Sequence, residues 1–344
     1  MSDALARALA GATVVTPNRR LARHLSDRHD RSQLAAGRRA WPSARVLPWP
    51  AWIATMEAEA VAAGVLPPSI RLPSHASAEW WRAAIEADAA PVPDAGALAE
   101  SAAEAWELVR AYGAGAESWR AWAGGDDEPA AFARWAERYR TALESRNATD
   151  AAAAPDRVAR ASASMPSWRG RPIALAGFLD LDPQQGRVVD ALERAGALVE
   201  RVSTLGDAMA APTRAEFASP RHELAAALAW ARGEVERRED ARVGIVVPDL
   251  AQRLASVRLA AIDVLGVPGE GEGRSPAWNL SLGTPIDSVP VVAAALDLIA
   301  LAWLALPVGR AAALLRSAHL PGAAGDARRH RAEVERRWLE RGVD

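Results

Sequence analysis

The chain has 344 residues, a formal net charge of -2, no cysteine and 41 basic residues, every one of which is arginine. The absence of lysine excludes a phosphate-binding loop of the GxxxxGK[ST] type and Schiff-base catalysis, because both need a lysine amine. The absence of cysteine excludes disulfides, thiolate metal sites and cysteine nucleophiles. The abundance of alanine, arginine and proline is typical of GC-rich codons, so the arginine content by itself is weak evidence for nucleic-acid binding.

Charge is distributed unevenly along the chain. Residues 1–50 hold nine Arg and three Asp, a local balance of +6, whereas residues 51–150 hold 16 acidic residues and eight Arg, a balance of -8. This change of sign indicates modules with different surfaces. The N-terminus lacks the apolar core of a secretory signal, and the longest apolar run, 289–307, is interrupted by Asp297. We therefore expect a buried helix there rather than a membrane span, and a cytoplasmic protein.

The first half of the chain predicts two strands and then a long helical region. Residues 12–16 (ATVVT) are a β-branched run, and residues 19–34 follow it with apolar side chains at helical spacing. A second short strand is predicted at 45–47, with a helix after it. Residues 74–143 have a helical pattern throughout, and residues 151–163 are predicted to form an Ala/Ser-rich connection.

The second half returns to an alternation of strands and helices. Strands are predicted at 172–178, 197–202, 214–218 and 242–247, and helices at 183–195, 220–238, 250–265, 289–304 and 308–319. This order is typical of an α/β protein. It predicts a first α/β domain over 1–73 and 164–210, an inserted helical subdomain over 74–163, and a partial second domain over 211–344.

Several stretches have the patterns of superfamily 1 helicase motifs, in the right order. TPNRRLARHL (16–25) looks like motif Ia, and RAWPSARVLPWPAWI (39–53) looks like the next strand and loop. LAGFLDLDPQQGRVVDAL (175–192) has the spacing of motif II, with Gly177 and Phe178 in place of an Asp-Glu pair and Gln185 near the family's Gln.

The stretches at 216–235, 242–250 and 279–301 look like the start of a second helicase-like domain. Over nearly its whole length the chain thus resembles the N-terminal part of proteobacterial DNA-repair proteins related to AddB and RecC, whose helicase-like regions are often inactivated. The resemblance implies a P-loop-helicase-like parallel sheet with an inserted all-helical subdomain and the start of a second α/β domain.

The resemblance also implies a helicase-like domain that has lost ATP hydrolysis. A helicase needs a lysine on the phosphates and an acidic pair that holds Mg²⁺, and this sequence has neither, so we expect no cofactor, no metal and no ATP hydrolysis. Asp180 and Asp182 are expected to be solvated acids of a loop. The charged segment 328–344 ends without a return to a sheet, so we expect a fragment of a longer protein whose PD-(D/E)XK exonuclease domain lies beyond Asp344.

Candidate DNA-binding residues follow the first predicted strand. In the family, the motif Ia turn meets the DNA backbone, and guanidinium, amide and hydroxyl groups are common phosphate contacts. The alternative is a helix cap with solvated arginines. Trp41 and Trp49, flanked by prolines, are candidates for base stacking, whereas the other tryptophans are expected in the core. The candidates after the strand are Thr16, Asn18, Arg19, Arg20 and Arg23; Arg28, Arg31, Arg38 and Arg39 extend this surface only if they share a face.

Two functions remain open from the sequence. The first is a non-catalytic, helicase-like DNA-binding and scaffolding module of a bacterial helicase-nuclease for double-strand-break repair and recombination. Its expected partners are DNA, as a single strand or a duplex end, and an active helicase-nuclease subunit. The alternative is a two-lobed α/β enzyme such as a nucleotide-sugar transferase.

Overall fold

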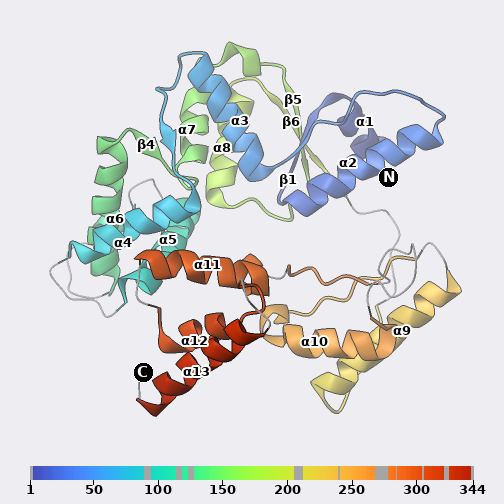
Figure 1. Ribbon diagram of the computed structural model, residues 1–344. Coiled ribbons are helices and arrows are strands. Elements are labelled where there is room, and N and C mark those ends of the chain that lie inside the picture. Colours follow the sequence, from blue (N-terminus) through green and yellow to red (C-terminus); the bar gives the residue numbers. More distant parts are fainter. Residues whose placement is uncertain are drawn as a thin grey trace. The chain divides into compact units, whose positions relative to one another are not determined.

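A computed structural model describes residues 3–88, 94–113, 118–122, 128–204, 212–238, 241–267, 278–283, 285–303, 306–320 and 325–341. The chain divides into two compact units, residues 1–210 and 211–344, which are described separately (Figure 1). The protein is α/β and mostly helical. In its described residues both sheets, one of four parallel strands and one of two, belong to the first unit.

The four-stranded sheet forms the centre of the first unit, in the order β2-β1-β5-β6. The strand β1 (Thr13–Thr16) pairs in parallel with β2 (Val46–Pro48) on one side and with β5 (Pro172–Ala176) on the other. The edge strand β6 (Leu198–Val202) pairs with β5. All four strands predicted for this unit are confirmed, with small shifts at their ends.

Helices cover both faces of this sheet because successive side chains of a strand point to opposite faces (Figure 1). Val14 of β1 packs against α1 (Asp3–Gly11) and α2 (Arg19–Ala35). Its neighbour Val15 packs on the other face, where Ile173 and Leu175 of β5 join it. The helices on that face are α3 (Trp49–Ala62), α7 (Ala154–Ala161) and α8 (Pro183–Arg194).

The two central strands send the chain in opposite directions. From β1 the crossover through α2 leads outward to β2, and from β5 the crossover through α8 leads outward to β6. Right-handed crossovers that run in opposite directions put their helices on opposite faces, as α2 and α8 are. The carboxyl ends of β1 and β5 are therefore the switch point of the sheet, where open α/β folds bind ligands.

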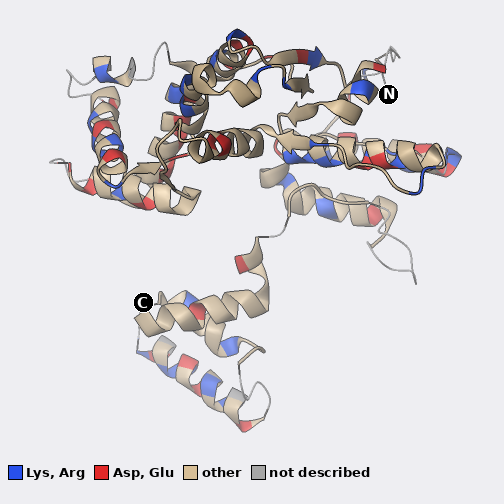
Figure 2. Ribbon diagram, turned by 90° about the horizontal axis from the view of Figure 1, so that it is seen from above, with Lys and Arg blue, Asp and Glu red and all other residues tan. Residues whose placement is uncertain are grey.

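A helical subdomain is inserted between α3 and α7. Its helices pack around Trp81, which stacks on Tyr139 with ring centroids 4.4 Å apart and lies 5.9 Å from Trp106. All three side chains are buried, so the expectation of core tryptophans is confirmed for Trp81 and Trp106. It is wrong for Trp230 and Trp303 of the second unit, which are more than half exposed. The elements are β3 (Ile70–Arg71), α4 (Ser74–Glu86), α5 (Ala95–Tyr112), a 3-10 helix (Ser118–Trp122), α6 (Glu128–Ser145) and β4 (Ala148–Thr149). Figure 2 shows the basic and acidic residues of α6 interspersed along the helix.

The Ala/Ser-rich segment predicted as a connection contains a buried helix instead. Pro155 stands in the first turn of α7, and Val158 and Ala161 follow on one face. Both are buried in the core that covers the sheet. Alanine can be buried, but it is small and gives only a weak apolar pattern, which is why the sequence did not predict this helix. Because its buried face packs in the core that covers the sheet, α7 belongs to the sheet domain rather than to the insertion.

Partly buried ion pairs join the insertion to the sheet domain. The carboxylate of Glu57 in α3 accepts from Arg71 of β3 at 3.0 Å and from Arg157 of α7 at 2.7 Å. Glu57 is 7% exposed. A second acid, Asp156 of α7, accepts from Arg110 of α5 at 2.7 Å. The insertion is thus held to α3 and α7 by charge pairs as well as by apolar contact.

The second unit contains helices but no strand in its described residues, so the expected start of a second α/β domain is not found there. The segments 214–218 and 242–247 are not paired as strands, and Val246 is 90% exposed. A strand needs a neighbour to satisfy its backbone groups, and neither segment has one among the described residues. The helices are α9 (Pro220–Arg237), α10 (Leu250–Leu265), α11 (Pro290–Trp303), α12 (Val308–Arg316) and α13 (Asp326–Glu340).

The apolar run near 289–307 forms α11, but its side chains are less buried than expected. Ile299, Leu301 and Trp303 are each more than half exposed. Asp297 is buried and pairs with Arg310 of α12, which explains the carboxylate inside an apolar helix. Among the described residues, no helix is long and apolar enough to cross a membrane.

We expect Glu57→Ala to lower the free energy of unfolding by about 3 kcal/mol, because removing one partner of a buried pair leaves the other charges uncompensated. The matched control is Glu79→Ala, which removes an exposed partner of Arg82 on α4 and should cost less than about 1 kcal/mol. Urea unfolding followed by circular dichroism measures both. Equal losses in the two variants would contradict the role assigned to Glu57.

Candidate nucleic-acid interface

The switch point of the sheet is closed by a contact between a helix and a glycine. Gly177, directly after β5, has φ +80°, a backbone conformation that glycine tolerates and other residues rarely adopt. A Cβ built at this position would lie 2.3 Å from Cδ2 of Leu21 in α2 and 3.7 Å from Cγ2 of Thr204 after β6. The first turn of α2 therefore packs directly onto the β5–α8 turn.

The β5–α8 turn is anchored at both ends. Phe178 meets the Trp49 ring edge-on, with centroids 6.1 Å apart. Asp182 caps α8 by accepting from the Gln185 backbone N–H at 2.8 Å, and the Gln185 side chain accepts in return from the Asp182 N–H at 3.2 Å. Leu179, at the tip between these anchors, is 92% exposed.

These contacts define what the motif II-like stretch does in this chain. Gly177 and Phe178 stand where the resemblance implies an acidic pair, and both serve packing. Gln185 and Asp182 form a capping box, and Asp180 is exposed. The described residues contain no group of three side chains placed to hold a metal ion. This turn is built as a structural support for α2 and α8.

Two of the candidate contact residues are structural. Thr16 is fully buried, and its hydroxyl donates to the Asn18 carbonyl at 2.9 Å, so the proposed direct contact between Thr16 and phosphate is wrong. Asn18 is the N-cap of α2, where its side-chain oxygen accepts from the Leu21 N–H at 2.9 Å. Its carboxamide nitrogen has no hydrogen-bond partner among the described residues, so both of its N–H donors are available to a ligand.

The three arginines of the candidate site lie on the first turns of α2 and are exposed. Arg19 and Arg20 begin the helix, and Arg23 follows one turn later. Within the described residues Arg19 and Arg23 have no ion-pair partner. The start of a helix also carries unpaired backbone N–H groups and a partial positive charge, which together attract anions. The sheet edge and the helix start thus place positive charge at the switch point.

The two proline-flanked tryptophans have different surroundings. Trp49 begins α3, is 7% exposed and packs on Trp52 with ring centroids 5.1 Å apart. Its proposed role in base stacking is wrong, because its faces are covered by core residues. Trp41 is partly exposed, and its indole N–H donates to Asp30 of α2 at 2.7 Å. Trp41 therefore has a fixed side chain at the end of α2 opposite to Arg19.

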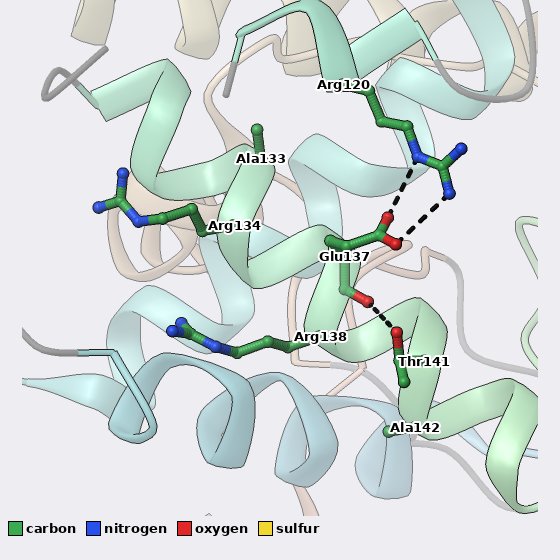
Figure 3. Close-up of a pocket in the computed structure, with 7 residues that line it drawn as sticks. All are labelled: Arg120, Ala133, Arg134, Glu137, Arg138, Thr141 and Ala142. Atoms are coloured by element: carbon green, nitrogen blue, oxygen red, sulfur yellow. Dashed lines mark hydrogen bonds and ion pairs between the residues drawn. The ribbon is translucent and has the colours of Figure 1, made fainter. Parts of the chain in front are cut away.

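A hollow of about 750 Å³ on α6 is a separate surface feature (Figure 3). The guanidinium of Arg120 donates two hydrogen bonds to Glu137, at 3.2 and 3.4 Å, and the hydrogen bonds from Arg140 and then from Arg120 hold the pKa of Glu137 below its usual range. Arg134 and Arg138 reach the other way and pair with Asp88. These charges are matched within the subdomain, so we assign the hollow no ligand.

No protein-family model matches the chain, and no curated protein matches it significantly. The class of protein that the structure defines is an α/β protein with a small doubly wound parallel sheet and a helical insertion. The sequence indicated the candidate arginines but not the contact of Leu21 with Gly177. The only sequence signal for this contact is the glycine itself, since a glycine after a strand often marks the close approach of another side chain.

We expect Gly177→Ala to lower the free energy of unfolding by at least about 2 kcal/mol, from the collision with Leu21 and the left-handed backbone. Gly186→Ala is the control, because this glycine lies within α8 with open space around its Cα and alanine there should stabilise the helix by about 0.5 kcal/mol. Thermal unfolding compares the two variants. A neutral Gly177→Ala would contradict the close approach of α2.

We also expect no stabilisation of the protein by Mg-ATP, because the chain has no lysine and the β5–α8 turn offers no carboxylate at the strand end. A ligand at a hundred times its Kd would add about 2.7 kcal/mol of stability. Melting curves with and without millimolar Mg-ATP, together with a phosphate-release assay, measure this. A saturable rise in melting temperature or steady phosphate release would refute the expectation.

Proposed function

We propose that the first unit is a non-catalytic DNA-binding and scaffolding module of the helicase-like kind, acting in bacterial DNA repair. The observation that carries the proposal is the row of exposed arginines, Arg19, Arg20 and Arg23, at the carboxyl end of β1 beside the switch point. The resemblance of the same stretch to helicase motif Ia supplies the ligand class, the DNA backbone.

The physical basis of this binding is local rather than global. The chain has a net charge of -2, so it has no overall attraction to a polyanion. Guanidinium groups pair with phosphate oxygens through two parallel N–H donors, and the start of α2 adds backbone N–H groups. Binding of this kind is independent of sequence and weakens as salt rises, because each phosphate contact releases bound counterions.

The proposed absence of motor chemistry is supported by what occupies the switch point. Leu21 fills the space above Gly177, Phe178 is turned into the core, and Asp182 caps α8. None of these groups can hold the phosphates and Mg²⁺ of a nucleotide. The module is therefore proposed to position DNA for an active helicase-nuclease subunit or domain rather than to move along it.

The alternative, a two-lobed α/β enzyme, lacks an observation in its favour. It needs a second sheet across a cleft, and the described residues of the second unit contain no strand. It also needs a constellation of polar catalytic groups, whereas the acids and amides at the switch point are used as helix caps.

We expect Arg19→Ala/Arg23→Ala to raise the Kd for a fluorescein-labelled single strand about tenfold and to make the salt slope shallower by about 1.4 for two lost phosphate contacts. The readout is fluorescence anisotropy with single-stranded, tailed and blunt duplex DNA. The control is Arg160→Ala/Arg194→Ala, two exposed arginines in the last turns of α7 and α8.

The control should leave the Kd unchanged, since α7 and α8 end at the opposite edge of the sheet. Equal losses in the two double variants would show that binding is diffuse and would refute the site. No binding by the wild-type chain at tens of micromolar in low salt would refute the proposed function itself.

A further inference from the structure

We propose that a single DNA strand lies along the whole outer face of α2, from Arg19 at the sheet edge to a second contact formed by Arg38, Arg39 and Trp41. This inference rests on the proposed DNA-binding function and specifies its ligand: an unpaired strand long enough to reach both ends of the helix. The argument uses the charges on α2, the loop that follows it and the length between them.

One face of α2 is apolar and packed, and the opposite face is basic. Ala22, Leu25 and His29 are buried. At 100° per residue the direction opposite to them is occupied by Arg20, Arg23, His24, Asp27, Arg31 and Leu34, all of which are exposed. Arg19 lies at the side of this face, at the start of the helix. The structure thus answers the question that periodicity left open: Arg31 shares the face of Arg20 and Arg23, while Arg28 is displaced to the side and is partly buried.

The loop after α2 carries two more exposed arginines near the C-terminal end of the helix. Arg38 and Arg39 are exposed and have no ion-pair partner among the described residues. Trp41 follows them, partly exposed and held in place by its hydrogen bond to Asp30 of α2. A tryptophan whose orientation is fixed and whose ring is partly open offers a surface on which a base can stack.

The geometry sets the length of the strand. The 17 residues of α2 span about 25 Å at 1.5 Å per residue. A stacked strand rises about 3.4 Å per nucleotide along its axis, so roughly seven nucleotides reach from one end of the helix to the other. An oligonucleotide of four nucleotides is too short to engage both ends at once when its bases are stacked.

An unpaired strand fits this surface better than a duplex does. The cations form a single row along one helix, which follows one phosphate backbone, and Trp41 needs a base that is free of its partner in order to stack. A blunt duplex presents two backbones and no open base faces except at its ends. The proposal therefore commits to single-stranded DNA as the occupant.

Asp27 gives the inference its sharpest test, because it lies within the row of arginines. A phosphate backbone on this face is repelled by its carboxylate, so Asp27→Asn should lower the Kd for a 12-nucleotide single strand about two- to fivefold. A gain of affinity is not produced by misfolding. The control is Asp190→Asn in α8, since each of these exposed acids has a backbone carbonyl that accepts from an arginine four residues later.

The contact formed by Arg38, Arg39 and Trp41 is tested by varying the length of the oligonucleotide and by substituting Trp41. Arg38→Ala/Arg39→Ala should weaken binding of a 12-nucleotide strand about tenfold and should remove most of the preference for 12 over four nucleotides. Trp41→Ala should weaken the longer strand about five- to tenfold, whereas Trp41→Phe, which keeps an aromatic face and loses the bond to Asp30, should retain most of the affinity.

The outcomes separate this inference from the proposed function. If Asp27→Asn and the far-end variants bind like wild type while Arg19→Ala/Arg23→Ala binds weakly, the extended path is wrong and the switch-point contact stands. Tighter binding of a blunt duplex than of a single strand also overturns the path. If the wild-type chain binds no DNA, both proposals fail together.

Discussion

The packing of Leu21 against Gly177 is the contact on which the arrangement of the first unit depends. It joins the helix that follows β1 to the turn that follows β5, the two points where the chain leaves the sheet in opposite directions. A side chain at position 177 would have to displace the side chain of Leu21 from this contact. The exposed side of α2, with its arginines, is set by the residues that its inner face must bury.

The first unit presents positive charge on α2 although the chain has a net charge of -2. Several acidic residues of the unit are paired with arginines in contacts that hold its parts together, as Glu57 is with Arg71 and Arg157 and Asp156 is with Arg110. The arginines on the outer face of α2 are exposed. Since the Debye length at physiological ionic strength is about 8 Å, a ligand near α2 experiences the local arginines and not the net charge of the chain.

The sequence predicted the sheet of the first unit well because short β-branched or apolar runs followed by helical patterns leave few alternatives. It could not predict that Thr16 and Trp49 are buried, since polar or proline-flanked positions look the same whether or not another helix covers them. The buried face of α7 consists largely of alanine, so the sequence did not distinguish this helix from a connecting segment. In the second unit, the residues 242–247 have the composition of a strand but pair with no other strand among the described residues. The residue pattern of a segment does not show whether a partner strand is present.

In the proposed module, the motif II-like stretch and the basic face of α2 are separate parts of the structure. Gly177, Phe178 and Asp182 of the β5–α8 turn are engaged in packing and capping. The exposed arginines lie on the opposite side of α2 from its buried residues, in solvent, where a substitution costs little stability. Variation of Phe178 or Asp182 in the turn therefore need not disturb the outer face of α2, because no side chain is common to both.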